Sequence, residues 1–416
     1  MEKLRLAAVL FTVAATAASQ RFPIPEPSQN ELERVNYHRV TTPVKSYRSP
    51  APEPGAENTP LISPLIGADS GRVRNAEEWY RSRRPELVRL WTAVLGKTSP
   101  APEDMQWFDP IRVVERSSSD RGRYTRIDLD LFIERDLRDP HLLLLPKGQG
   151  PGPFPVVIAW TSSTPDYRQP EIWWGSYLAS HGYVVLTSQG TRRSGRTVEQ
   201  VYERFGHWLG LGMKPYIVAR QIEYLRRVPQ ADTSRIGFIG FSWGAKSAVY
   251  VAAFNPDIKV TVAVDPHIAV NGGTNWYAPG YLDWLRKFDG IRSPDYPVPE
   301  LRGAVQSLLN PDVTRPGFER DHHELLSLVA PRAFLLIGGS RSEDGGGDSD
   351  DLQSWAYVNR AKEVYTLLGL PERLQYCSTA DGHRANGKEI DPAWQAFFRH
   401  FLQEQPIEFS GYPAQR

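Results

Sequence analysis

The sequence predicts an α/β protein with a doubly wound, mostly parallel sheet, and three observations support this fold class. Uninterrupted apolar runs are typical of parallel strands that are buried on both faces. Helical segments lie between these runs, as in strand–helix–strand units. Residues 127–131 alternate between apolar and polar, which predicts antiparallel strands near the amino-terminal side of the sheet. The apolar runs are 155–160, 183–186, 236–240, 260–264 and 333–337.

The amino-terminal residues 1–19 have the composition of a signal peptide. Lys3 and Arg5 form a positive region, residues 6–15 form a short apolar core, and small residues follow it. A helix that spans a membrane needs about 20 apolar residues, so this core is too short to be an anchor. We therefore expect a secreted or periplasmic protein without a membrane anchor after cleavage.

Residues 20–74 are expected to form a proline-rich linker or an arm on the domain surface. Proline lacks a backbone donor and resists regular structure, and it is abundant in residues 22–27 and 49–55. Asn75 followed by Glu78 resembles a helix N-cap with its reciprocal acid. The α/β domain is therefore expected to span residues 75–405, with a carboxy-terminal tail at 406–416.

The remaining elements follow from periodicity and from short strand signals. The expected strands are 111–115, 127–131 and 374–377, in addition to the five apolar runs, and the expected helices are 217–227, 354–368 and 393–402.

The balance of charge bears on which partners to expect. The chain has 49 basic and 48 acidic residues, so its charge gives no reason to expect nucleic acid or an anionic membrane. The one cysteine, Cys377, cannot form an internal disulfide and is expected to pack as a small hydrophobic residue. The 12 Trp and 18 Tyr suit a large core and equally a cleft that stacks on sugars.

The chemical signal with the most structural context is Gly240-Phe241-Ser242-Trp243-Gly244. It follows a buried strand directly and precedes a helical pattern at 248–254. Strand, tight turn and helix are the setting of a nucleophile elbow, in which glycines give room to a strained serine backbone. The structural alternative is an ordinary glycine–serine turn that caps a helix.

A nucleophilic serine needs a base and an acid that orients the base. His383 is the candidate base, because it follows the strand at 374–377 and precedes the last helix. His322 and His323 could bind a metal, but two adjacent histidines on a helix point in different directions.

The orienting acid is expected in the loop that follows the strand at 333–337. Asp344 is the preferred residue, and Glu343 and Asp348 are the alternatives in the same loop. If none of them reaches His383, the acid would arise one strand earlier, at Asp265. A flexible acidic loop or a calcium site is the other interpretation, although the loop lacks EF-hand spacing.

The oxyanion hole is expected to combine two backbone donors. The Trp243 N–H is one, because it follows the nucleophile. The second is expected from the loop after Trp160, with Ser163 preferred to Ser162. Trp174 and Trp276 are the candidate lining residues of a substrate pocket, with core packing as the alternative for both.

Once these segments are laid out, the chain resembles the acetyl-xylan-esterase and dienelactone-hydrolase-like branch of the α/β-hydrolases over residues 79–401. Parts are also similar to bacterial glucuronoyl esterases, which share a lysine four residues after the serine, as Lys246 is here. Those enzymes have Arg where this chain has Trp243. Relatives often have His-Gly where this chain has Thr161-Ser162. The matching segments are 84–87, 236–246, 328–339, 355, 364–369 and 382–383.

The resemblance implies a secreted carboxylic ester hydrolase that acts through a Ser-His-Asp triad and an acyl-enzyme intermediate. Its candidate substrates are plant-polysaccharide esters, deacetylated or otherwise de-esterified, and Lys246 would contact a sugar hydroxyl. A solvated helix residue is the alternative for Lys246. No metal or cofactor is expected. A serine peptidase or amidase, or a non-catalytic carbohydrate-binding protein, remains an alternative, because the triad itself does not distinguish ester from amide cleavage.

Overall fold

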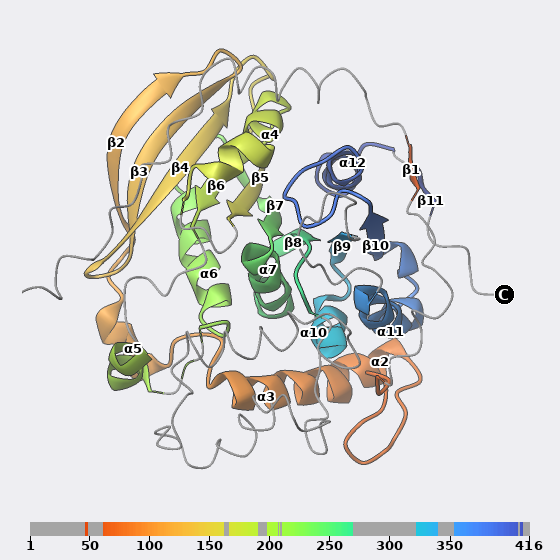
Figure 1. Cartoon of the computed structure of the whole chain (residues 1–416). Helices are drawn as coiled ribbons and strands as arrows, with labels where there is room; N and C mark the ends of the chain where they lie inside the picture. The colour runs from red at the N-terminus through yellow and green to blue at the C-terminus, as the bar shows by residue number, and fades with distance from the viewer. Residues whose placement is uncertain are drawn as a thin grey trace, which may run out of the picture.

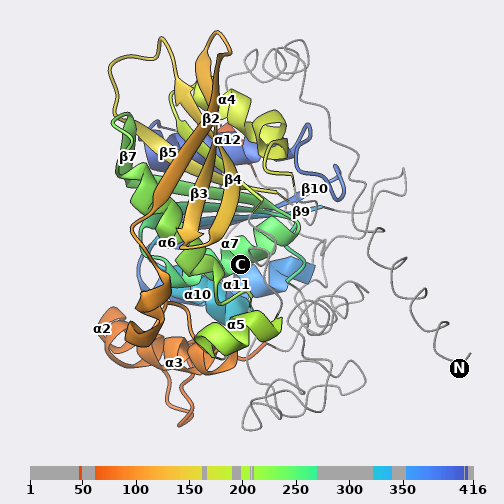
Figure 2. The same cartoon turned by 90° about the vertical axis from the view of Figure 1, so that its left-hand side faces the viewer.

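The computed structural model describes the protein at residues 46–48, 61–161, 166–189, 198–206, 208, 210–268, 322–339, 353–406 and 408–410. A mixed sheet runs through the molecule with helices on both faces (Figures 1 and 2). Its nine strands follow the order β10-β9-β8-β7-β5-β6-β4-β3-β2. This is the architecture of an α/β-hydrolase, as the sequence predicted.

The antiparallel part of the sheet is a three-stranded meander at one edge. β2 pairs with β3, β3 with β4, and β4 with β6, all antiparallel. The sequence predicted antiparallel strands in this part of the chain, and the structure confirms them; β4 was not among the expected strands. The strands are β2 (Arg112–Asp120), β3 (Tyr124–Glu134) and β4 (Leu137–Pro146).

The parallel part contains all five apolar runs and the expected strand near Cys377. Each of these strands pairs parallel with its neighbours in this part. Helices cover both faces, and therefore the strands are apolar throughout rather than alternating. Cys377 is buried in β10, as expected of a small hydrophobic residue. The strands are β5 (Phe154–Trp160), β6 (Val184–Ser188), β7 (Ala231–Phe241), β8 (Ile258–Val264), β9 (Ala333–Gly339) and β10 (Leu374–Thr379).

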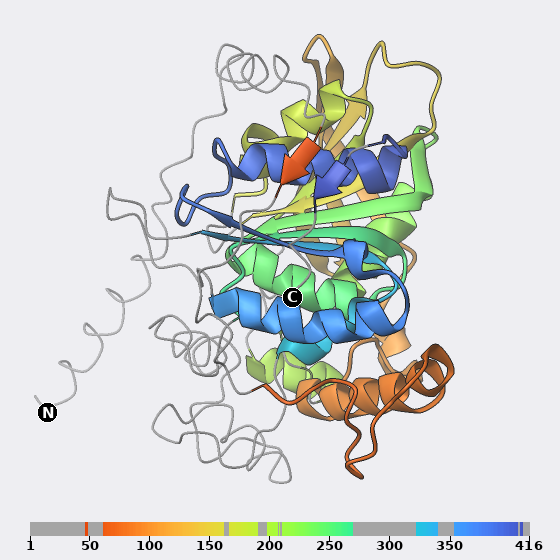
Figure 3. The same ribbon diagram turned by 90° about the vertical axis from the view of Figure 1, so that its right-hand side faces the viewer.

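The helices form a layer on each face of the sheet, as Figure 3 shows. The helix α7 follows Ser242 directly and is buried along nearly its whole length, because α6 and α10 pack against its outer side. One face carries α4 (Ser176–Ser180) and α12 (Ile390–Gln403); the other carries α6 (Lys214–Leu225), α7 (Trp243–Phe254), α10 (His322–Val329) and α11 (Gln353–Leu367).

Outside this layer, α3 packs on α10 at the lower edge of the molecule in Figure 1. The predicted cap is confirmed: the Asn75 side chain accepts a hydrogen bond from the Glu78 N–H at 2.9 Å. The outer elements are α2 (Ala76–Glu78), the π-helical turn η1 (Trp79–Arg83), α3 (Arg84–Leu95), η2 (Pro102–Trp107), η3 (Glu171–Gly175), α5 (Val198–Phe205) and η5 (Pro371–Arg373).

Residues 61–74 pack on the domain as an arm. Leu61, Leu65 and Val73 are buried in the same hydrophobic cluster as the central helices. The His323 imidazole contacts the Ile62 carbonyl at 2.8 Å, and the Ser63 hydroxyl donates to Glu363 on α11. The core therefore includes residues before the expected boundary at Asn75.

The two ends of the described chain meet at a small separate sheet. β1 (Ser46–Arg48) pairs parallel with β11 (Glu408–Ser410), and β1 contacts α12 (Figure 3). The expected signal segment, residues 1–19, lies outside the described residues. Among the helices that are described, none combines the length and the apolar character that crossing a bilayer requires.

The arm gives a stability test. Replacing Leu65, which is 4% exposed, by Ala should lower the free energy of unfolding by about 2–3 kcal/mol, because it removes a buried side chain and leaves a cavity. The control is Ile62→Ala in the same arm, where the side chain is 50% exposed and the loss should stay within about 0.5 kcal/mol. Urea denaturation measures both values, and equal small losses would show that the arm contributes nothing to the core.

Candidate active site

The turn between β7 and α7 holds the predicted nucleophile. Ser242 has φ 53° and ψ −112°, a strained conformation for a residue with a side chain. Its backbone N–H donates to the Val264 carbonyl at the end of β8, at 2.9 Å. The strand, the tight turn and the buried helix have the geometry of a nucleophile elbow.

The two glycines of the motif are required by close backbone contacts. A Cβ atom on Gly240 would lie 2.3 Å from the Gly244 carbonyl oxygen, and one on Gly244 would lie 2.2 Å from the Thr161 carbonyl oxygen. Backbone atoms cannot move aside as a flexible side chain can. The motif therefore also fixes the elbow against the end of β5.

Asp265 is the first residue after β8, the strand next to the elbow. Its backbone N–H donates to the Ile337 carbonyl of β9 at 2.7 Å, and its φ is 53°. The residue is only 1% exposed. Its carboxylate is therefore held on a rigid, buried turn at the carboxyl edge of the sheet.

His383 lies in the loop between β10 and α12. A Cβ atom on Gly339, the last residue of β9, would lie 2.3 Å from the Gly382 carbonyl oxygen, so this loop touches the strand end. Trp174 donates from its indole N–H to the Ala385 carbonyl at 2.9 Å and so contacts the same loop. The His383 side chain remains 25% exposed.

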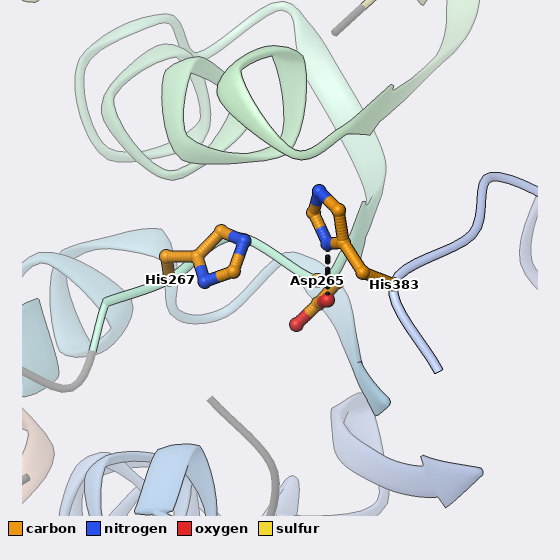
Figure 4. Close-up of side chains that lie close together, drawn as sticks. All are labelled: Asp265, His267 and His383. Carbon is orange, nitrogen blue, oxygen red and sulfur yellow. Dashed lines mark hydrogen bonds and ion pairs between the residues drawn. The ribbon is translucent and has the colours of Figure 1, made fainter. Parts of the chain in front are cut away.

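His383 and Asp265 form a short hydrogen bond, shown in Figure 4. The His383 Nδ1 and the Asp265 Oδ2 are 2.5 Å apart. A carboxylate at this distance accepts from Nδ1–H, which leaves the lone pair of the imidazole on Nε2. The Phe241 ring, next to Ser242, lies 4.6 Å from the His383 ring between centroids. The arrangement gives a histidine whose Nε2 can act as a base.

Ser242 and His383 are not hydrogen-bonded to each other among the described contacts, although both come from the same edge of the sheet. Such bonds are often long in enzymes without substrate and tighten when substrate is bound.

The expected acid, Asp344, lies outside the described residues, as do Glu343 and Asp348. The hydrogen bond to His383 Nδ1 that we expected from their loop is made by Asp265, the alternative one strand earlier. Ser163 and Trp276 also lie outside the described residues.

Trp174 adopts the alternative that the sequence left open for it, which is packing in the core. Its side chain is fully buried, with its indole N–H on the Ala385 carbonyl, so it supports the His383 loop from within the core. Its neighbour Trp173 is partly buried and packs edge-on against Phe241 at 5.6 Å between ring centroids. Trp173 is therefore the aromatic residue of this pair nearer the surface.

Two further side chains line this region. Lys246 is only 5% exposed, which rules out a solvated helix residue, and its ammonium lies 5.5 Å from the centre of the Trp243 ring.

His267 follows Asp265 by two residues, and its ring is 4.7 Å from that of His383 between centroids. Burial, and then the charges of Lys246 and His383, lower the pKa of His267 well below its usual range. We did not single out His267 from the sequence, because nothing in its spacing marks it.

Three of these residues could hold a metal ion. Asp265, His267 and His383 offer one ligand atom each, and these atoms lie within 4.8 Å of one another. The adjacent His322 and His323 have different partners. The His322 Nε2 lies 3.1 Å from the Tyr250 hydroxyl, whereas the His323 Nε2 contacts the Ile62 carbonyl.

Comparison with known proteins identifies the family to which the chain is similar. The protein-family model described as "Glucuronyl esterase, fungi" matches residues 141–369, more than half of the 416-residue chain. The chain is 25% identical over 370 residues to 4-O-methyl-glucuronoyl methylesterase 1 of Wolfiporia cocos, covering 86% of this chain and 84% of that protein. It is 23% identical to the enzyme of the same name from Phanerochaete chrysosporium, covering 85% and 72%.

Solved structures with the same fold include the glucuronoyl esterase of Solibacter usitatus. That structure has a TM-score of 0.62 and 17% identity, covering 82% of this chain and 98% of its own. A glucuronoyl esterase from Sporotrichum thermophile, a serine-to-alanine variant bound to methyl 4-O-methyl-β-D-glucopyranuronate, has a TM-score of 0.55 and 16% identity, covering 89% and 94%. At these identities the likeness establishes the fold.

The contact between Gly339 and Gly382 predicts a local defect. In Gly339→Ala the new Cβ would collide with the Gly382 carbonyl, so the His383 loop should shift and its hydrogen bond to Asp265 should weaken. Proton NMR would follow the downfield imidazole N–H resonance typical of such a bond, which should be present in the wild type and lost in the variant.

The matched control is Gly71→Ala, whose Cβ would have the Asp69 side chain as its nearest neighbour, at 3.0 Å. It should keep the downfield resonance. A Gly339→Ala protein with an unchanged resonance would mean that the strand end does not position the loop.

Proposed function

Because the chain belongs to the glucuronoyl esterase family of α/β-hydrolases, we propose that it hydrolyses esters in which a glucuronic acid supplies the carboxyl group. The chain is a serine carboxylic ester hydrolase, and we propose Ser242 as its nucleophile, His383 as its base and Asp265 as its acid. The observation that carries this assignment is the 2.5 Å hydrogen bond between Asp265 and His383, formed at the edge of the sheet where the elbow lies.

The proposed reaction has two halves. The His383 Nε2 takes the proton from the Ser242 hydroxyl, the Oγ adds to the ester carbonyl, and the alcohol leaves with that proton. Water then attacks the acyl-enzyme with the same base, and the carboxylic acid is released. Asp265 stays ionised throughout and stabilises the imidazolium that forms in each half.

Asp265 replaces Asp344 in this proposal for a physical reason. Its carboxylate is buried, and its backbone is tied to β9 through the hydrogen bond to Ile337. A carboxylate held in this way can fix the His383 ring with little loss of side-chain freedom when the substrate binds. Asp344 keeps no required role in the triad.

The oxyanion needs donors aimed at the place where negative charge develops. We infer that the Trp243 N–H is one, because Trp243 is the first residue of α7 and directly follows the nucleophile. The close approach of Gly244 to the Thr161 carbonyl holds the end of β5 against the elbow, which supports a second donor from the residues that follow it, Ser163 among them.

The substrate class follows from the relatives and from Lys246. The relatives are named 4-O-methyl-glucuronoyl methylesterases, and one solved structure holds a methyl glucuronate ester. In such an ester the sugar is the acyl part, so it stays bound through both halves of the reaction. In an acetyl ester the sugar leaves first. We infer that Lys246, buried in the first turn of the elbow helix, binds a hydroxyl of the retained sugar.

We propose that the ester is carried on a plant polysaccharide. Residues 1–19 have the composition of a signal peptide, which supports export of the enzyme to such a polymer.

A substrate panel tests the proposal. Methyl 4-O-methyl-glucuronate should be hydrolysed with a kcat/KM well above that for acetylated xylan or a short p-nitrophenyl ester, because only the glucuronate keeps its sugar in the site. Ser242→Ala should lower kcat by about 10⁴-fold or more while the protein stays folded. Preference for acetyl esters would contradict the substrate, and full activity in folded Ser242→Ala would contradict the nucleophile.

A further inference from the structure

We propose that Asp265, His267 and His383 form a binding site for a divalent transition-metal ion such as Zn²⁺, and that the bound ion inhibits the enzyme. The inhibitory part rests on the proposed function, in which His383 is the base. The binding part does not, because it depends only on three side chains that the fold brings together.

The arrangement of the three ligands supports the site. Figure 4 shows the His383 imidazole directly above the Asp265 carboxylate and the His267 imidazole beside them. Zinc binds nitrogen and oxygen ligands at about 2.0–2.2 Å in a tetrahedron, so neighbouring ligand atoms lie roughly 3.3–3.5 Å apart. The three ligand atoms here are within 4.8 Å of one another, so a movement on the order of 1 Å completes the geometry.

One ligand can move while the other two stay fixed. Asp265 and His267 lie on one short turn after β8, with φ of 53° and 52°, and both are buried. His383 comes from a separate loop and is 25% exposed. A small rotation of His383 toward His267, whose ring is already 4.7 Å away between centroids, closes the site.

The donor set selects the kind of ion. Two imidazoles and one carboxylate suit Zn²⁺, Co²⁺ or Ni²⁺, and the fourth position is left for water. Mg²⁺ and Ca²⁺ prefer oxygen ligands alone. The nearby Lys246 ammonium opposes any cation and sets an upper limit on the affinity.

Inhibition follows from the way His383 is used. The ion takes Nδ1, because this nitrogen faces the Asp265 carboxylate whereas Nε2 points away from it (Figure 4). The proton on Nδ1 then moves to Nε2, so the lone pair that would accept the Ser242 proton is occupied and the hydrogen bond to Asp265 is lost. The imidazole no longer serves as the base, and removal of the ion by EDTA restores it.

The binding experiment uses the full chain with Ser242→Ala, which removes any dependence on catalysis. Zn²⁺ is titrated in competition with a chromophoric chelator, and we expect one equivalent to bind. Adding His267→Gln should weaken binding by at least about tenfold, since a ligand is lost. Adding Lys246→Met should strengthen it. The control is His400→Gln on α12, whose imidazole contacts the Gln405 carbonyl and the Phe401 ring, and which should leave Zn²⁺ binding unchanged.

A second ligand variant and a spectrum keep the test valid if the His267→Gln variant does not fold. Asp265→Asn should also weaken Zn²⁺ binding, and Co²⁺ in the Ser242→Ala protein should show the visible absorption of a tetrahedral site. Absence of Zn²⁺ binding, or equal binding with and without His267, would overturn the proposal.

The two proposals can fail separately. Hydrolysis of glucuronate esters without Zn²⁺ binding would leave the enzyme assignment intact and remove the metal site. Zinc binding that requires His267, in a protein without esterase activity, would do the reverse. If both proposals hold, Zn²⁺ should inhibit the wild type. Inhibition of His267→Gln should need at least about tenfold more Zn²⁺, when the rate of each protein is compared with its own rate without zinc.

Discussion

The hydrogen bond between Asp265 and His383 is the interaction on which the site depends. It joins the turn after β8 to a loop that begins more than one hundred residues later, after β10. Because Asp265 is tied to β9 and the elbow is tied to the end of β8, the proposed base and the proposed nucleophile share one rigid frame. In the proposed triad, Asp265 orients His383 only while its carboxylate stays ionised beside the imidazole.

Close backbone contacts build this frame. Gly240 and Gly244 let the elbow fold against β5, and Gly339 lets the His383 loop rest on β9. No side chain fits at these three places, so the glycines set the distances between strand ends. Trp174 completes the support from the core by holding the Ala385 carbonyl. The site is therefore positioned mainly by backbone packing at the sheet edge.

The strands, the elbow and His383 could be predicted from the sequence because each has a local signal: an apolar run, two glycines around a serine, or a histidine after the last strand. The acid could not be chosen, since reaching His383 Nδ1 depends on which strand ends are neighbours. The loop around Asp344 offers many carboxylates, whereas Asp265 stands alone after β8. The burial of Trp174 could not be predicted either, because a tryptophan in a segment between strands can line a cleft or pack in the core.

The most direct test of the triad compares kcat for Asp265→Asn and Asp344→Asn on the methyl glucuronate ester. Asp265→Asn should keep the fold and lower kcat by about 10³–10⁴-fold, because the amide favours the wrong imidazole tautomer, whereas Asp344→Asn should stay close to wild type. A large loss in Asp344→Asn, with Asp265→Asn nearly unaffected, would contradict the assignment of the acid to Asp265, directly after β8.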